Sequence, residues 1–447
     1  MRKITVTLLC AFILLFSNAS FGQNLSVEKY KRDLDTLKEV LKKDHPSLYR
    51  FRTQSSINEM FDKCSRLIDS STTDRDFYRI IKLILSGIHD GHLGCTPSDS
   101  LKKFFDDTEK CFPVTLIFIK NKAFVDCDKG GIFPRGTEII SINKEAVNTI
   151  RKNLFGYIVS DGKIKTKKYY ILNHTFWFYY NLVYGSKDRY QIKYRKSNGI
   201  ISERSVIAAT KNNIECENLL QTKDAKLLDL KYPQKATALL TIRSFAYDDL
   251  SEAKEDFVSF IDSSFKNIEQ KKIKTLIIDL RNNGGGKDIY GSLLYSYLTN
   301  RSFRYYKKLE TTSKQLTEAD HSNLAIQHPN LLNFKGKVYV LTNGLSFSVT
   351  TEFCAIAQSN HRAVFIGEET GGTYYGNTSG RFIDVSLPYS SVTIHIPVVK
   401  YSMSVSDIKN KDRGIIPDYQ IIPTIKDLVK GNDTVLNFAL KLAKEKK

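Results

Sequence analysis

The chain has 447 residues, of which 41% are hydrophobic and 26% charged, and a formal net charge of +19. This length allows two or three domains with a sizeable core, and the composition is that of a globular protein rather than a fibrous or disordered one. Lysine and arginine are scattered along the chain apart from short runs such as Lys163–Lys168. We therefore expect no nucleic-acid partner, and attribute the charge to solubility and to acidic surfaces or substrates.

Residues 1–22 have the pattern of a secretory signal peptide. Arg2 and Lys3 precede an apolar run from Val6 to Phe16, and small residues follow up to Gly22. The apolar run is short for a membrane span, although an uncleaved anchor is the alternative. We expect cleavage before Gln23 and an exported protein, periplasmic or secreted. No second long apolar run follows, so no stable membrane insertion is expected of the mature chain.

Cysteine usage does not indicate a zinc site. Six cysteines remain after the signal, and an oxidising compartment permits disulfides among them. None forms a Cys-x-x-Cys pair, and we expect no metal or organic cofactor. Cys111 and Cys127 flank a predicted hairpin and are candidates for a disulfide, but spacing alone does not decide the pairing. The six residues are Cys64, Cys95, Cys111, Cys127, Cys216 and Cys354.

Residues 23–110 are predicted to form an N-terminal helical segment. Apolar residues recur at helical spacing over Leu25–Lys43, and Pro46 ends that pattern. A second amphipathic helix is expected over Asp74–Ile88. The turn Asp90-Gly91-His92 follows it directly.

Residues 111–230 are predicted to form a PDZ-like and aromatic region. Strands are expected over 114–119 and 123–126, joined by a polar turn. The segment 133–143, followed by a helix from Val147, resembles the second half of a PDZ domain. Tyr169–Tyr184 is strongly aromatic and contains the only tryptophan. That segment is either a packed layer between domains or the wall of a substrate cleft.

Residues 231–430 alternate predicted strands with predicted helices, which indicates βαβ units around a largely parallel sheet. A hairpin closes this core over 381–396, and residues 431–447 form a C-terminal helix. The expected strands are 238–242, 275–279, 338–342 and 364–366, and the expected helices lie near 251–270, 288–299 and 349–358.

Two strand-to-helix turns in this core have the composition of a serine nucleophile site. The strand 275–279 ends at Gly284, Gly285 and Gly286, and the strand 338–342 ends shortly before Ser348. Glycine lets backbone N–H groups approach a reacting carbonyl, and a serine at a helix N-terminus can lie beside them. The alternatives are a flexible turn for the glycines and a helix N-cap for Ser348, with Ser346 as a competing nucleophile. The phosphate-loop pattern is not met.

A serine nucleophile needs a base, and histidine titrates in the useful range. His89 and His92 lie in a tight turn that can present a side chain into a cleft, and we select His92 as the base. A capping or core histidine is the alternative interpretation. His361 is expected in a loop after the Ser348 helix, and His395 lies inside a predicted strand.

With these residues assembled, the chain resembles the tail-specific, or C-terminal processing, serine peptidase family over roughly residues 75–425. The resemblance implies an α/β fold: a crotonase-like β/α core with a PDZ-like module, preceded here by the N-terminal helical segment. It also implies a nucleophile at Ser348 and oxyanion donors at Gly284, Gly285 and Val349. The motifs that carry it start at Leu276 (Leu-Ile-Ile-Asp-Leu-Arg-Asn-Asn-Gly-Gly-Gly), Leu341 (Leu-Thr-Asn-Gly-Leu-Ser-Phe-Ser), Ile366 (Ile-Gly-Glu-Glu-Thr-Gly-Gly) and Gly414 (Gly-Ile-Ile-Pro-Asp).

One departure from that family concerns the base. The processing peptidases use a lysine 25 residues after the serine, and Thr373 stands there in this chain. The chain is more similar to the tricorn-like branch, in which a histidine in an N-terminal turn is the base, and His92 matches that turn. The branch has an acidic residue where Lys411 stands here. Asp412, which we select, and Glu368 are the candidates for the acid that orients His92.

The sequence therefore predicts an exported serine endopeptidase that acts on peptide or protein substrates, with Ser348, His92 and Asp412 as its catalytic residues. The alternative is a non-catalytic protein that binds a peptide or another ligand on the same scaffold. A surface or assembly factor that uses the PDZ-like and aromatic segments is a third hypothesis. Substrate, cleavage rule and oligomeric state are not encoded in any pattern that we recognise.

Overall fold

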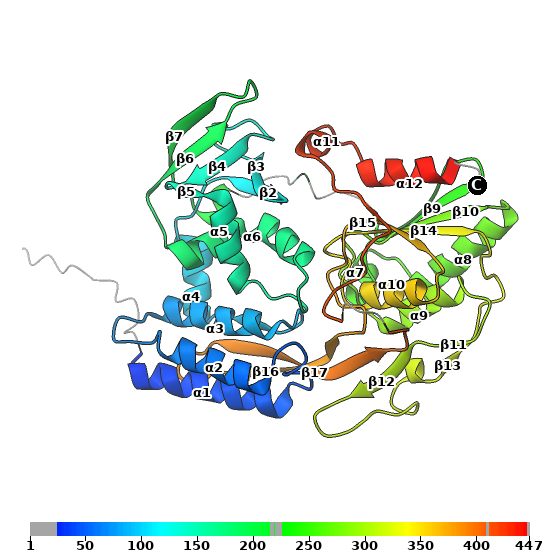
Figure 1. The fold of residues 1–447 in the computed structure, drawn as a ribbon, viewed down its shortest axis with the longest axis horizontal. Helices are drawn as coiled ribbons and strands as arrows, with labels where there is room; N and C mark the ends of the chain where they lie inside the picture. The colour runs from blue at the N-terminus through cyan, green and yellow to red at the C-terminus, as the bar shows by residue number, and fades with distance from the viewer. Residues whose placement is uncertain (1–24, 215–218, 220–225, 408–410, 445–447) are drawn as a thin grey trace, which may run out of the picture.

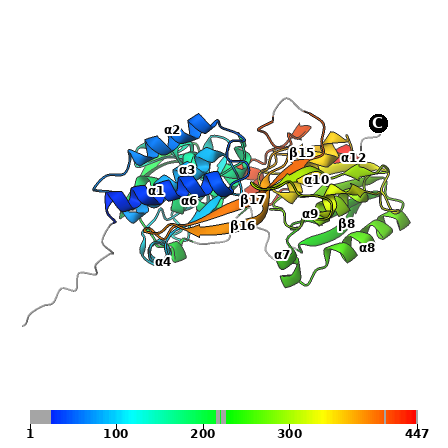
Figure 2. The ribbon, with the colours of Figure 1, turned by 90° about the horizontal axis from the view of Figure 1, so that it is seen from below.

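A computed structural model describes residues 25–214, 219, 226–407 and 411–444. The predicted signal peptide lies outside these residues. Two lobes stand side by side, and the long strands β16 (Thr378–Ser386) and β17 (Thr393–Met403) extend from one lobe toward the other (Figures 1 and 2). Within the described ranges, no helix combines the length and the apolar character that crossing a membrane requires.

Three helices form the N-terminal segment: α1 (Val27–Asp44), α2 (Gln54–Ser65) and α3 (Asp74–Ile88). Thr73 caps α3 in a capping box with Asp76, which explains why the helix begins there. The apolar faces of the three helices bury a common core that includes Ile394 and Ile396 of β17. The hairpin that sequence analysis places in the catalytic core thus also supports the N-terminal helices, and it is longer than expected.

The first lobe also contains a sheet with strand order β2-β3-β4-β6-β7, and β5 pairs with β4. Helix α6 packs against β2 and buries Phe176, Tyr179 and Tyr180 in the core of this sheet. The aromatic segment is therefore a core helix of this lobe. These elements are β2 (Thr115–Ile119), β3 (Lys122–Cys127), β4 (Glu138–Ile142), β5 (Glu145–Ala146), α5 (Val147–Leu154), α6 (Thr166–Tyr184), β6 (Arg189–Arg195) and β7 (Ile201–Ile207).

The proposed pairing of Cys111 with Cys127 is wrong. Cys111 is a free thiol that donates to the carbonyl of Ala209, whereas Cys127 is in a disulfide. Cys111 precedes the hairpin at an isolated bridge to Ala209, so flanking the hairpin does not bring the two sulfur atoms together. Cys64, Cys95 and Cys354 are also free.

The second lobe is built on a six-stranded sheet with order β18-β15-β14-β10-β9-β8. All neighbours from β9 to β18 are parallel, and β8 joins the edge antiparallel to β9. This is the largely parallel sheet that the sequence predicts. The strands are β8 (Leu228–Gln234), β9 (Thr237–Ile242), β10 (Thr275–Asp279), β14 (Lys337–Thr342), β15 (Val364–Gly367) and β18 (Tyr419–Gln420).

Helices cover both faces of this sheet, because its central strands carry apolar residues on both sides. Leu276, Ile278 and Val340 face the large core that contains residues of α8, α9 and α10. Ile277 and Leu341 face the other side, where α12 packs against them. The helices are α7 (Tyr247–Glu252), α8 (Phe257–Gln270), α9 (Asp288–Ser296), α10 (Val349–Ser359), α11 (Ile425–Val429) and α12 (Thr434–Lys444).

The fold class is therefore confirmed as α/β, with a β/α core and an N-terminal helical segment. The PDZ-like character of the first-lobe sheet and the proposed domain boundaries remain predictions. The remaining elements are short: β1 (Gly94–Thr96), α4 (Asp99–Lys103), a π-helical turn (Phe104–Thr108), β11 (Phe303–Arg304), β12 (Tyr306–Glu310), β13 (Ile326–Gln327) and three 3-10 turns at 155–157, 211–213 and 322–324.

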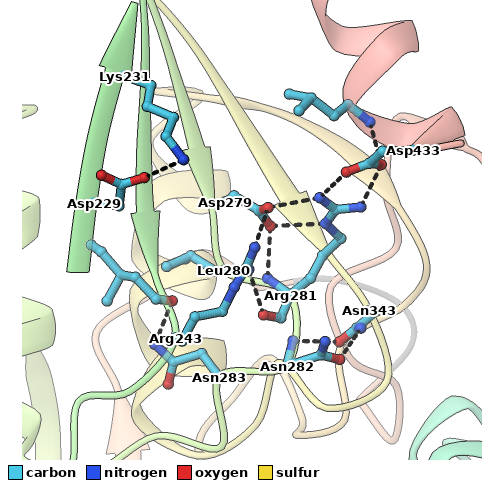
Figure 3. A network of polar contacts seen from close by, with 12 residues as sticks. Asp229, Lys231, Arg243, Asp279, Leu280, Arg281, Asn282, Asn283, Asn343 and Asp433 are labelled. Atoms are coloured by element: carbon cyan, nitrogen blue, oxygen red, sulfur yellow. Dashed lines mark hydrogen bonds and ion pairs between the residues drawn. The ribbon is translucent and has the colours of Figure 1, made fainter. Parts of the chain in front are cut away.

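A buried ion network fixes the carboxyl end of β10 (Figure 3). Asp279, whose side chain is 3% exposed, accepts from Arg281 and Arg243 at 2.7–2.8 Å. The guanidinium of Arg281 also donates two hydrogen bonds, of 2.7 and 2.8 Å, to the carboxylate of Asp433, which directly precedes α12. Burial alone would raise the pKa of Asp279, but the two guanidinium groups hold it well below its usual range. The network ties the end of the central strand to the C-terminal helix.

We expect Arg281→Gln to destabilise the fold by about 3–5 kcal/mol, because it leaves Asp279 buried with one cation instead of two. Asp433→Asn is the matched control and should cost about 0–1 kcal/mol, since the Asp433 side chain is 38% exposed. Urea unfolding measures both free energies. The pKa of Asp279 is depressed, so its stabilisation is present above the unfolded pKa of about 4 and is lost on acidification below it. The account would be contradicted if the difference in unfolding free energy between wild type and Arg281→Gln stayed the same at pH values below the unfolded pKa of Asp279.

Candidate active site

Hydrogen bonds join the two strand-to-helix turns of the core to each other. Ser346 Oγ donates to the carbonyl of Leu280 at 2.8 Å, and the N–H of Phe347 donates to the carbonyl of Asn283 at 3.0 Å. The side chain of Asn343 accepts from the N–H of Asn282 at 3.0 Å, as Figure 3 shows. The turn after β10 and the turn after β14 are thus one rigid unit, and Ser346 is a buried part of it.

Gly285 lies directly against Ser348. A Cβ on Gly285 would stand 2.7 Å from Cβ of Ser348 and 3.0 Å from the nitrogen of Val349, and Gly285 has a φ of +102°. Only glycine meets both conditions without strain. Of the sequence-predicted oxyanion residues, Gly285 therefore lies against Ser348 and the nitrogen of Val349, and Gly284 precedes Gly285 in the same turn.

The three predicted oxyanion donors differ in what their N–H groups do. The N–H of Gly285 donates to Asn283 Oδ1 at 2.9 Å. For the N–H groups of Gly284 and Val349, the described part of the chain provides no hydrogen-bond acceptor. An unoccupied amide beside a serine is what an oxyanion site needs. Val349, which follows Ser348 in the chain, has such an amide, and the roles of all three residues as oxyanion donors stay predictions.

Ser348 has the backbone of a strained nucleophile turn. Its φ of 54° and ψ of −126° lie where residues with a Cβ are rare, and its side chain makes no capping hydrogen bond to α10. The alternative interpretation of Ser348 as a helix cap is thus not supported. The side chain is partly exposed, whereas Ser346 is fully buried.

His92 reaches Ser348 from a distant part of the sequence. Its Nε2 lies 3.1 Å from Ser348 Oγ, although the two residues are 256 positions apart. The imidazole also stacks on the ring of Phe347, with 4.3 Å between the ring centroids. His89, the other histidine of this turn, instead ends α3 in a left-handed conformation. The structure therefore brings together the nucleophile and base that the sequence selects.

The electrostatic environment of His92 differs from that of a histidine in water. Burial, together with the positive charge of Lys167, lowers the pKa of His92 to about 3, and Asp90 opposes this shift. Asp90 accepts from the N–H of His92 at 2.9 Å and forms an ion pair with His45 at 3.1 Å. The imidazole is therefore neutral across the physiological range, and neutral imidazole is the form that accepts a proton.

The two predicted acids lie elsewhere. Asp412 forms an ion pair with Lys163 at 2.6 Å, which lowers its pKa. Glu368 accepts from the hydroxyl of Tyr170 at 2.6 Å, and burial raises its pKa. Neither residue contacts His92 within the described residues, and the role of Asp412 stays a prediction that no contact supports.

Sequence reasoning missed Asp161 and Lys167, which lie just before and within the start of α6. Asp161 Oδ1 accepts from the N–H of Gly91 at 2.6 Å, and Lys167 Nζ donates to the carbonyl of Gly91 at 2.8 Å. Both side chains are buried. The basic run Lys163–Lys168 was visible in the sequence, but nothing local distinguished the buried Lys167 from the half-buried Lys168 and the exposed lysines of the run.

Ligand-type atoms of Asp90, His92 and Asp161 lie within 4.8 Å of one another, which is the spacing of a metal-binding cluster. The ammonium of Lys167 and the guanidinium of Arg50 interact electrostatically with both carboxylates. Two buried cations therefore already offset the two acids and would repel a divalent cation. We assign no metal to this cluster.

Comparison with known proteins finds a family match for the core and solved structures with a similar fold. Residues 236–421 match the model of peptidase family S41. The fold is similar to that of mature CPAF, with a TM-score of 0.67 and 15% identity over 93% of this chain and 97% of that chain. Mature CPAF in complex with lactacystin gives a TM-score of 0.66, also at 15% identity, over 93% and 98% of the two chains. A candidate peptidase from Parabacteroides merdae gives 0.50 at 16% identity, over 95% and 98%.

The family match supports a serine-type peptidase, and residues 236–421 are similar to peptidase family S41. The family match covers the core that carries Ser348 and the glycine turn. The similar structures extend over nearly the whole chain and show that the first lobe belongs to the same fold. The histidine base and the orienting acid are outside what the comparisons test.

We expect Ser348→Ala and Ser348→Gly both to abolish labelling by a fluorophosphonate, because each removes the hydroxyl. Ser348→Gly should be the more stable of the two by about 1 kcal/mol, since glycine adopts the backbone of this position without strain. Labelling followed by peptide mass spectrometry, and urea unfolding, measure the two effects. Full labelling of Ser348→Ala, with the label on Ser346, would refute the assignment of the nucleophile.

Proposed function

We propose that the protein is an exported serine endopeptidase that cleaves peptide bonds through an acyl-enzyme on Ser348, with His92 as general base. The observation that carries this proposal is the 3.1 Å approach of His92 Nε2 to Ser348 Oγ at a strained turn lined by glycine amides. A nucleophile within hydrogen-bond reach of a base, beside unoccupied N–H donors, is the arrangement that acyl transfer requires.

In the proposed reaction, neutral His92 takes the proton of Ser348 through Nε2 as Oγ attacks the peptide carbonyl. The N–H groups of Gly284 and Val349 stabilise the resulting oxyanion, and Gly285 keeps the turn close to the reacting atoms. The protonated imidazole then gives its proton to the leaving amine. Water, activated by the same histidine, hydrolyses the acyl-enzyme and restores the serine.

The base of this site distinguishes it from a Ser–Lys peptidase. Thr373, at the position where the related processing peptidases have a lysine, is buried and donates its hydroxyl to the carbonyl of Gly376. It has no ionisable group to offer. The tricorn-like arrangement with a histidine in the N-terminal turn therefore remains our proposal for the branch to which this chain belongs.

A binding protein on the same scaffold is the second candidate function. It is favoured by the absence of contact between His92 and either predicted acid within the described residues.

Incubation of the purified mature protein with a peptide library decides between the two: defined cleavage products that disappear in Ser348→Ala support a peptidase. Retention of peptides by wild type and Ser348→Ala alike, without products, supports a binding protein.

We expect His92→Ala to reduce the acylation rate by about 10²–10⁴-fold, which is the usual contribution of general-base catalysis. His89→Ala is the matched control from the same turn and should change the rate by less than about threefold, because His89 does not contact Ser348. Stopped-flow acylation by an activated ester measures both. Equal losses in the two variants would indicate a general disturbance of the turn.

The pH dependence separates a histidine base from an amine base. Because the pKa of His92 is lowered to about 3, the imidazole is fully available at pH 7, and its own titration lies below the 6.5 of a free histidine. Acylation should therefore not rise across pH 8. Burial lowers the pKa of Lys167 to about 8. A rate that climbs through pH 8 and loses this climb in Lys167→Met would identify the lysine as the base and overturn the mechanism.

A further inference from the structure

The proposed mechanism does not say which group accepts the Nδ1 proton of His92. For Nε2 to accept from Ser348, neutral His92 must carry its proton on Nδ1. That nitrogen is buried and has no hydrogen-bond partner among the described residues. A buried N–H without an acceptor is costly, so a group near Nδ1 must accept it during catalysis.

Two carboxylates, those of Asp90 and Asp161, have an oxygen within 4.8 Å of a ring nitrogen of His92. Asp90 is already engaged through both oxygens, since Oδ1 accepts from the N–H of His92 and Oδ2 pairs with His45. Asp161 is engaged through one oxygen only. Its Oδ1 accepts from the N–H of Gly91, while its Oδ2 is buried without a hydrogen-bond partner in the described chain. Asp161 and His92 belong to the same cluster, with ligand atoms within 4.8 Å.

We propose that Asp161 is the positioning residue of the catalytic base, accepting the Nδ1 proton of His92 through Oδ2 in place of the acid expected at Asp412. This rests on the proposed function and names the group that completes it. This acceptor lies just before α6 in the first lobe, whereas Asp412 lies next to Gly414 in the sequence. Asp161 acts through His92 and does not touch substrate.

Lys167 holds the other backbone group of the same residue, Gly91. Its ammonium donates to the carbonyl of Gly91, while Asp161 accepts from the N–H of that residue, so the two side chains clamp the turn that carries His92. Lys167 Nζ also lies 3.3 Å from the ring centroid of Phe347, the residue before Ser348. One buried lysine therefore contacts both the base turn and the nucleophile turn.

The charges around Asp161 come from several elements. Asp90 faces it from the His92 turn, Lys167 from α6, and Arg50 from the segment after α1. Burial and the negative charge of Asp90 raise the pKa of Asp161, and Lys167 opposes this rise. Asp161 is therefore the group of this cluster that gains a proton on mild acidification. A protonated Asp161 is a weaker acceptor for the Nδ1 proton of His92.

Asp161→Asn is the sharpest single test. Asn retains an Oδ1 that can accept from Gly91, so the clamp is preserved, but it presents an N–H₂ group where Oδ2 stood. That donor favours the tautomer with the proton on Nε2, which cannot accept from Ser348. We expect acylation to fall by about 10²–10⁴-fold, with KM within about threefold, since a wrong tautomer costs about 10⁴ in the trypsin-like triad.

Asp412→Asn is the matched control, because it makes the same change in the acid that the sequence selects. It should keep at least half of the wild-type rate. The wild-type rate should decline between about pH 7 and 5 as Asp161 gains a proton, and the residual rate of Asp161→Asn should lose that decline. A full rate in Asp161→Asn, or a loss in Asp412→Asn alone, overturns the proposal.

A second measurement needs no activity and no folded Asp161 variant. Nitrogen-15 NMR of histidine-labelled wild-type protein, with the His92 signal assigned from His92→Gln, reports which ring nitrogen carries the proton. We expect Nδ1–H in the wild type, and Nε2–H in Asp161→Asn. A wild-type His92 protonated on Nε2 overturns the proposal. Residual labelling and hydrolysis in Ser348→Ala would instead refute the proposed function itself, so the two failures are distinguishable.

Discussion

The hydrogen bonds between the two strand-to-helix turns are the constraint on which the site depends. A serine at the start of α10 and a glycine turn at the start of α9 are separate features of the sequence, and nothing local sets their distance. Ser346 Oγ, the N–H of Phe347 and the side chain of Asn343 join the turns directly. Because β10 and β14 are neighbouring parallel strands, their carboxyl ends meet at one edge, and these bonds then fix Gly285 against Ser348.

His92, the proposed base, belongs to a turn outside this unit. The first turn of α6 holds that turn beside Ser348. A Cβ on Gly344 would lie 2.4 Å from the carbonyl carbon of Thr166, and one on Gly371 would lie 3.4 Å from Cβ of Lys167. The first turn of α6 therefore packs against the nucleophile loops at glycines. Lys167 extends from this turn to Gly91, so the first lobe and the core share a buried contact at the site itself. Moving the lobes apart would separate the base from the nucleophile.

The sequence predicted the core strands, the Asp74–Ile88 helix and the Ser348–His92 pair because each rests on a local pattern. Strand-to-helix turns with glycine, and a histidine after an amphipathic helix, are visible in one window of sequence. The acid was not predictable in this way. Asp161 lies 69 positions after His92 in the chain and has no motif of its own; its proximity depends on how α6 packs. Asp412 lies next to the motif position, which Lys411 occupies, and it is paired with Lys163. The free thiol of Cys111 likewise follows from strand pairing rather than spacing.

The depressed pKa of His92 bears on how such a site can work as a base. A base with a low pKa is always neutral but has a weak thermodynamic drive to take a proton. The burial and the Lys167 charge that depress it also exclude water and hold the imidazole stacked on Phe347. In the proposed mechanism, the imidazolium that forms as Ser348 gives up its proton gains the attraction of Asp90 and, through the contact we propose, that of Asp161. In the resting site, Arg50 and Lys167 offset the charge of these two acids. The proposed mechanism therefore lowers the barrier by stabilising the charged state rather than by raising the resting pKa of His92.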